Sequence, residues 1–152
     1  MTDSDATVTG QTGTPAHLWA TGIISLLWNS VGGVDYVMTQ TENAEYLDQF
    51  TPDQKAFFLS MPAWTEFFWA LGVWGAIIGS LLLLLRSRHA VTAFAASLVG
   101  LAVSTVWQLG LSGADLGKIF GPVPILMNVF IWGICIALWA YARRQVQVGV
   151  LR

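Results

Sequence analysis

The sequence predicts an all-α protein that is built as an integral membrane four-helix bundle. Of its 152 residues 55% are hydrophobic and only 11% are charged, and the mean hydropathy is +0.60. Four apolar runs are each about 20 residues long, which is the length that crosses a hydrocarbon core of roughly 30 Å. These runs lack the polar face that a surface helix of a water-soluble protein needs, which argues against a soluble bundle.

The chain begins with a polar, acidic segment, residues 1–16, that is rich in glycine and threonine. It has no basic region of the kind that opens a secretory signal, so we expect a flexible tail. A single four-helix domain is predicted over 17–143, with helices at about 18–38, 63–85, 90–111 and 122–142. A short basic C-terminal tail, 144–152, is expected to follow it.

Basic residues fix the expected orientation. They gather in the turn between the second and third helices and at the chain end, at Arg86, Arg88, Arg143, Arg144 and Arg152. The opposite side has only Lys55 and Lys118. The positive-inside rule therefore places the arginines in the cytoplasm, and an even number of spans places both termini there.

The loop between the first and second helices, 39–61, is amphipathic. Thr51, Pro52 and Asp53 predict a helix start, with an N-cap, a proline at the first helical position and an acid in the first turn; this helix is expected to end near Ser60. Large apolar side chains accompany it: Tyr46, Leu47, Phe50, Phe57, Phe58 and Leu59. The loop is either an interfacial segment on the membrane surface or a lid over the mouth of the bundle.

Each predicted helix brings a polar side chain into the outer half of the membrane, whereas the inner half is almost wholly apolar. These side chains are Asn29, Asp35, Glu66, Gln108 and Asn128, and Trp28, Trp74 and Trp132 lie deeper, near the midplane. Asp35 and Glu66 have similar depths on consecutive helices and are expected to face each other. The eight residues form a predicted pocket for a ligand or a proton, open toward the outside, which would suit a sugar ring with its apolar face and polar edges.

An alternative interpretation treats the same residues as structural. Amides and acids between membrane helices form contacts worth about 0.6 kcal/mol each, and tryptophans fill a loosely packed centre or face lipid. Small residues at helical spacing, such as Gly75, Gly79, Ser97 and Gly100, predict close helix contacts. The sequence leaves open whether these contacts lie within one bundle or between the copies of a homo-oligomer.

Sequence patterns of catalysis and cofactor binding are missing. His17 and His89 have no metal-ligand spacing, and there is no phosphate-binding glycine loop or nucleophile elbow. Because Cys135 is the single cysteine, no intramolecular disulfide can form. The net charge of −2 suggests no role in binding nucleic acid. We therefore expect no metal, no cofactor, no nucleic-acid partner and no enzymatic activity.

Three stretches resemble a group of small bacterial four-helix membrane proteins that usually carry the automatic label "sugar transporter". They are LLWNSVGGVDYVMTQT, YLDQFTPDQKAFF and PAWTEFFWALGVWGAIIGSLLLLLRSR. The resemblance implies a multi-pass protein of the bacterial inner (cytoplasmic) membrane, and it assigns no binding residues.

Two functions follow from these patterns. The first is transport or binding of a small polar solute, a sugar among the candidates, through the outward-facing pocket. The second is a non-transporting accessory or structural membrane protein whose polar residues are packing contacts. The chain is small for a carrier and shows no inverted repeat with broken helices. The expected partners are the lipid bilayer, a small polar solute and a second copy of the chain.

Overall fold

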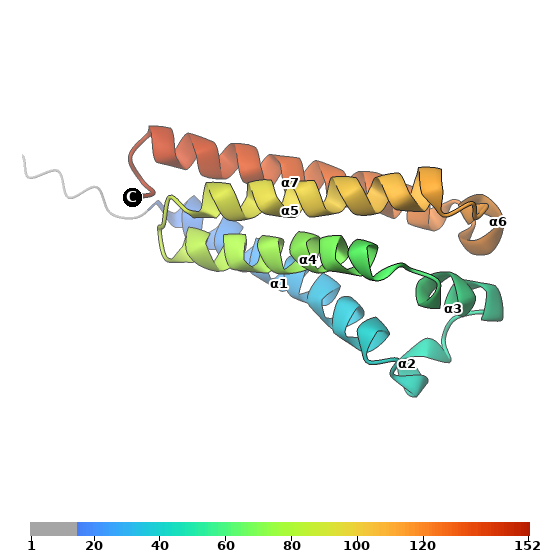
Figure 1. Cartoon of the computed structure of the whole chain (residues 1–152). Helices are drawn as coiled ribbons and strands as arrows, with labels where there is room; N and C mark the ends of the chain where they lie inside the picture. The colour runs from blue at the N-terminus through green and yellow to red at the C-terminus, as the bar shows by residue number, and fades with distance from the viewer. Residues whose placement is uncertain (1–14) are drawn as a thin grey trace, which may run out of the picture.

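Four long helices, each antiparallel to the next one along the chain, dominate the computed structural model, which describes residues 15–152 (Figure 1). They are α1 (Ala16–Gln40), α4 (Ala63–Leu84), α5 (Ala90–Val106) and α7 (Val123–Gln147). The shorter elements are α2 (Ala44–Leu47), α3 (Pro52–Leu59), the π-helical turn η1 (Trp107–Leu111) and α6 (Leu116–Phe120). No strand occurs between residues 15 and 152, so the all-α prediction is confirmed for this part of the chain. Residues 1–14 of the predicted N-terminal tail lie outside the described residues.

Three helices are long and apolar enough to cross a membrane: Ala63–Leu84, Ala90–Leu111 and Val123–Gln147. By length and composition, these three helices are compatible with a membrane protein. Helix α1 is as long as α7, with 25 residues, but it is not among the three. Its serines, glycines, Asn29 and Asp35 lower its mean hydropathy, so a fourth span at α1 stays a prediction.

Helices α4 and α5 approach each other at the level of their backbones. A Cβ atom added to Gly75 would lie 3.0 Å from the Ser97 nitrogen, and one added to Gly100 would meet the backbone of Gly72 and Phe68. The Ser97 hydroxyl donates a hydrogen bond of 2.6 Å to the Gly72 carbonyl. The small residues on these two helices therefore pack within one chain, which answers the question that the sequence left open for them.

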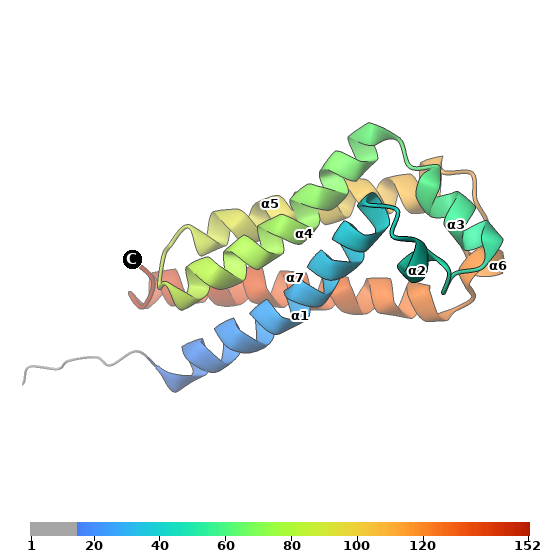
Figure 2. The same ribbon diagram turned by 90° about the horizontal axis from the view of Figure 1, so that it is seen from below.

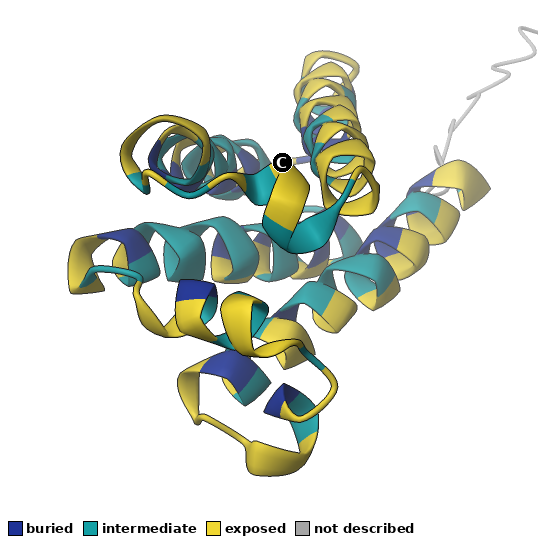
Figure 3. Cartoon of the chain, turned by 90° about the vertical axis from the view of Figure 1, so that its right-hand side faces the viewer, coloured by how far each residue is buried: buried dark blue, intermediate teal, exposed yellow. Residues whose placement is uncertain are grey.

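The outer helices pack on this pair less completely. Helix α1 lies against α4 and crosses the other long helices at an angle (Figures 1 and 2), while α7 lies against α5. Their remaining surfaces are exposed, as the yellow outer faces in Figure 3 show, and carry many large apolar side chains. The exposed side chains include Ile24, Leu27 and Val31 on α1, and Val123, Leu126 and Val129 on α7.

The buried apolar core gathers at one end of the bundle, beside the turn that joins α4 to α5. Its members come from all four long helices and the chain end: Leu18, Leu83, Ala90, Phe94, Leu138, Ala142 and Leu151. The described chain starts and ends on this side of the molecule (Figure 1). We call this side the arginine end, because all five arginines lie at the α4–α5 turn, in the last turns of α7 or at the chain end.

The C-terminal segment, expected as a short basic tail, is partly helical and packs on the bundle. Helix α7 continues to Gln147 rather than ending near 142, and the residues after it dock onto the α4–α5 turn. The Arg88 nitrogen donates to the Arg152 carbonyl at 3.0 Å, and the Arg152 nitrogen donates to the Arg86 carbonyl at 2.9 Å. Leu151 is only 3% exposed. The segment is held because its backbone satisfies the polar groups of the turn while Leu151 fills the core.

The contact between α4 and α5 yields a direct test with a matched control. Gly100→Ala should lower the free energy of unfolding by about 1–3 kcal/mol, since the added methyl group meets backbone that cannot move without separating the helices. Gly133→Ala on α7 should be neutral or stabilising by up to about 1 kcal/mol, because a Cβ atom there has nothing within 4 Å. The measurement is reversible unfolding of both variants in the same detergent. Equal stabilities would contradict the close packing at Gly100.

Candidate functional site

The loop between α1 and α4 has the helix start that the sequence predicts. The Thr51 hydroxyl accepts a hydrogen bond from the Gln54 nitrogen at 3.4 Å, and the Gln54 side chain accepts one from the Thr51 nitrogen at 3.1 Å. Pro52 occupies the first helical position and Asp53 lies in the first turn. These contacts form a capping box, so the predicted start is confirmed, and α3 ends at Leu59.

Helix α3 lies across the end of α5 and beside α6. Phe57 is only 7% exposed, with its ring 5.5 Å from those of Trp107 and Phe120. The Gln54 amide donates to the Ile119 carbonyl at 3.1 Å. Six aromatic residues meet here and form what we call the outer aromatic cluster: Tyr46, Phe50, Phe57, Phe58, Trp107 and Phe120. This covering of the bundle end is what the lid interpretation expects, and contact with a membrane surface stays a prediction.

Asn29, the deepest of the five predicted polar residues, joins α1 to α4. Its amide donates to the Ala76 carbonyl at 3.2 Å and to the Ser80 hydroxyl at 3.0 Å. The Ser80 hydroxyl in turn donates to the Ala76 carbonyl at 3.0 Å. The Asn29 side chain is half-buried, and both of its recorded bonds go to the neighbouring helix. It therefore acts as an interhelical contact.

Asp35 faces the outer loop and not α4. It is exposed, and its carboxylate accepts a hydrogen bond from the Tyr46 hydroxyl. The next residue, Tyr36, is the one that packs on α4: its ring centroid lies 5.0 Å from that of Trp69. Successive residues of a helix point about 100° apart. Asp35 and Tyr36 therefore have different neighbours. No hydrogen bond between Asp35 and Glu66 is recorded within residues 15–152, and the expected pairing of the two acids stays a prediction.

Three predicted pocket residues are half-buried and have no recorded side-chain hydrogen bond to any described residue: Glu66, Gln108 and Asn128. Gln108 lies in η1, the π-helical turn that extends α5. Turns of this kind shift the register of the side chains that follow and are frequent at functional sites. Within the described chain, no hydrogen bond or ion pair connects any two of the five predicted polar residues, so a converging polar site is not recorded.

The three deep tryptophans have separate contacts. The Trp132 indole donates to the Thr105 hydroxyl at 3.2 Å and so joins α7 to α5. Trp28 packs edge-on against Phe130 of α7, with 5.6 Å between ring centroids. Trp74 is 43% exposed. No ring contact between any two of these tryptophans is recorded in the described part, so they are not seen to form one layer.

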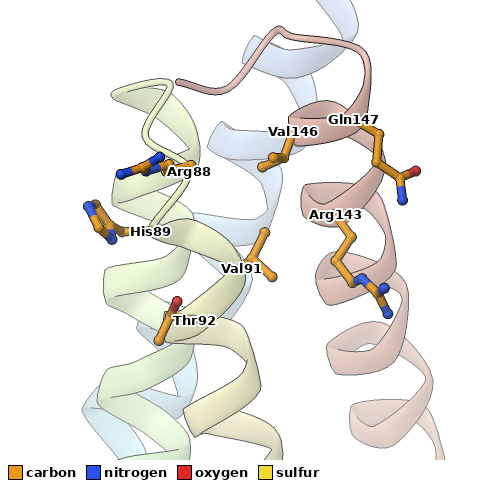
Figure 4. Close-up of a pocket in the computed structure, with 7 residues that line it drawn as sticks. All are labelled: Arg88, His89, Val91, Thr92, Arg143, Val146 and Gln147. Atoms are coloured by element: carbon orange, nitrogen blue, oxygen red, sulfur yellow. The ribbon is translucent and has the colours of Figure 1, made fainter.

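A cavity of about 340 Å³ opens at the arginine end, between the start of α5 and the last turns of α7 (Figure 4). Its lining residues are Arg88, His89, Val91, Thr92, Arg143, Val146 and Gln147. None of the eight predicted pocket residues lines it. The sequence analysis used Arg88 and Arg143 only to orient the chain. The gathering of arginines at one side of the predicted bundle could have pointed to this region. Arg88 and Arg143 are far apart along the chain, however, so the sequence does not show that they border one space.

Comparisons with known proteins assign no family. A scan against protein-family models, a search of the curated proteins and a search of the solved structures each find no match to this chain. The resemblance to the group labelled "sugar transporter" therefore stays a prediction. The function is inferred below from the contacts of the residues themselves.

The contact between Tyr46 and Asp35 yields a pH-dependent prediction. Burial, the hydrogen bond to Asp35 and the negative charge of Asp35 raise the pKa of Tyr46 above its ordinary value of 10.0. The neutral phenol is thus favoured in the folded protein. The resulting stabilisation is fully present below pH 10.0 and is lost as the pH rises through the higher pKa of the folded state.

The measurement is the tyrosinate absorbance of the folded protein just above pH 10. Tyr46→Phe should leave this absorbance unchanged there, because Tyr46 is still protonated. In an Asp35→Asn background the pKa of Tyr46 should fall toward its ordinary value, and the same Tyr46→Phe change should then remove absorbance. Loss of absorbance in both backgrounds would show that Asp35 does not hold the Tyr46 proton.

Proposed function

We propose that this chain is a multi-pass membrane protein that acts as a non-transporting accessory or structural component. The observation that carries the proposal is the bonding of Asn29, whose amide donates to the Ala76 carbonyl and to Ser80 on α4. An amide in hydrocarbon is costly unless it is hydrogen-bonded. Here the neighbouring helix supplies the acceptors, as expected of a residue that holds helices together.

Helix α1 belongs in this proposal as the fourth span. Its 25 residues would reach across a hydrocarbon core, and exposed Ile24, Leu27 and Val31 would face lipid. Asn29 is directed at α4 rather than outward. With four spans, the arginines and both ends of the described chain lie on one side. By the positive-inside rule this side is the cytoplasm, and by the resemblance the membrane is a bacterial inner membrane.

A second candidate function, binding or transport of a small polar solute such as a sugar, is favoured by one observation. Glu66, Gln108 and Asn128 are half-buried without a recorded side-chain hydrogen bond within residues 15–152. Polar groups in such positions usually find a partner, and a solute would supply one from the outer side. The two candidates make opposite predictions for the variants below.

A stability experiment tests whether Asn29 holds α1 against α4. Asn29→Ala should lower the free energy of unfolding by about 0.6–1.7 kcal/mol. Ser30→Ala is the matched control, since Ser30 is exposed and its hydroxyl donates only to Leu26 of the same helix. It should change stability by less than about 0.5 kcal/mol. Equal effects of the two substitutions would remove the support that Asn29 gives to the proposal.

The same assay with a panel of monosaccharides tests solute binding. An accessory protein should show no change in unfolding temperature with any of them, and Glu66→Gln should be neutral or stabilising because it removes a half-buried charge. A bound solute at a hundredfold excess over its Kd would stabilise by about 2.7 kcal/mol. Stabilisation that Glu66→Gln abolishes would establish the second candidate instead.

Reporter fusions test the proposed topology. If α1 crosses the membrane, reporters before Met1 and after Arg152 should both behave as cytoplasmic, and one inserted near Gln49 as external. If only α4, α5 and α7 cross, the reporter before Met1 should instead share the location of the one near Gln49. Activity of the Arg152 fusion on the outer side would reverse the orientation of the whole chain.

A further inference from the structure

The cavity at the arginine end is not used by the proposed function. Figure 4 shows Val91 and Val146 between α5 and α7, whereas the side chains of Arg88 and His89 point outward on the α5 side and those of Arg143 and Gln147 point outward on the α7 side. The two valines are half-buried, whereas the polar lining side chains are exposed. The space thus has an apolar floor, with one guanidinium group on each of its two sides.

Charge is sharply divided between the two ends of the described chain. Its acidic side chains all lie away from the arginine end, in the last turns of α1, in the loop between α1 and α4, at the start of α4 and just before α6. They are Asp35, Glu42, Glu45, Asp48, Asp53, Glu66 and Asp115. The two lysines there are paired, Lys55 with Asp48 at 2.7 Å and Lys118 with Asp115 at 3.1 Å. No salt bridge is recorded for any arginine within the described part. Arg88 and Arg143 therefore have no carboxylate partner on a described side chain and are available to an external anion.

The two arginines are also positioned by their surroundings. The Arg143 guanidinium lies over the Trp139 ring, 4.7 Å from its centroid, a contact that restrains the side chain while leaving its N–H edge free to donate. The backbone of Arg88 is fixed by its hydrogen bond to Arg152. The positive N-terminal end of α5 and the negative C-terminal end of α7 both border the cavity. Their dipoles oppose each other, so the charge of the cavity comes from its side chains.

We propose that this cavity binds the phosphate of an anionic phospholipid headgroup. Guanidinium groups match phosphate oxygens in geometry and charge, and Thr92 and Gln147 add hydrogen-bonding groups at the rim. The valine floor suits the glycerol and the first acyl carbons.

The position of the cavity favours a lipid over a soluble phosphate. The cavity is bordered by the ends of two helices that are long and apolar enough to cross a membrane. In the proposed orientation it therefore lies at the level of the cytoplasmic headgroups, where basic sites between helices meet anionic lipids. The inference rests on membrane insertion as proposed above, but not on the choice between an accessory protein and a solute carrier.

The test measures lipid binding by the full chain in nanodiscs of phosphatidylcholine with or without phosphatidylglycerol, and by native mass spectrometry of the same protein in detergent. Arg88→Gln and Arg143→Gln should each weaken phosphatidylglycerol binding about fivefold relative to phosphatidylcholine. Arg144→Gln is the matched control: it removes the same charge from the adjacent position of α7 but does not line the cavity. It should change binding less than twofold. Unfolding temperatures of all variants establish that they fold.

Three results would overturn the proposal. The first is equal binding of phosphatidylcholine and phosphatidylglycerol by the unmodified chain. The second is a loss in Arg144→Gln as large as that in Arg143→Gln, which would show a diffuse attraction rather than a site. The third is competition by inorganic phosphate that depends on Arg88 and Arg143 without any lipid preference, which would assign the cavity to soluble phosphate. Failure to enter nanodiscs at all would instead contradict the membrane insertion on which both proposals depend.

Discussion

The backbone contact between α4 and α5 is the interaction on which the rest of the structure depends. Gly72 and Gly75 on α4, with Ser97 and Gly100 on α5, bring the two helices close enough for the Ser97 hydroxyl to reach the Gly72 carbonyl at 2.6 Å. Between membrane helices lipid gives no hydrophobic drive to association, so close packing and interhelical hydrogen bonds must hold them. Helix α1 is then added on the α4 side and α7 on the α5 side.

Polar side chains attach the remaining helices to this pair. Asn29 joins α1 to α4, and Trp132 joins α7 to Thr105 on α5. The Cys135 sulfur lies 3.6 Å from the Ser97 hydroxyl, so α7 also meets the centre of the α4–α5 contact. Asn29 is thus one of the residues that lower the mean hydropathy of α1, and it also fixes the position of this helix against α4. This relation explains why α1 is not among the three helices that are apolar enough to cross a membrane and yet has a defined place beside α4.

The two ends of the molecule differ in chemistry. The arginine end holds the apolar core, the docked C-terminal segment and a cavity bordered by arginines without recorded salt bridges. The opposite end holds the outer aromatic cluster and the acidic side chains, with both lysines in ion pairs. In the proposed membrane orientation the first end meets anionic headgroups and the second faces outward. The division of charge therefore serves both the orientation of the chain and the proposed lipid site.

The sequence by itself determined the four long helices and the start of α3, because apolar length, proline and capping residues act over a few neighbouring positions. It predicted the long helical runs, the start of α3 at Thr51 and the small faces of α4 and α5. Only the tertiary structure decided which side chains meet. Asp35 and Tyr36 differ by one position, yet one contacts Tyr46 and the other packs on α4, since the rotation of α1 against α4 depends on distant contacts. For the same reason the sequence could not show that Arg88 and Arg143 border one cavity: residues this far apart along the chain are brought together only by the packing of α7 on α5.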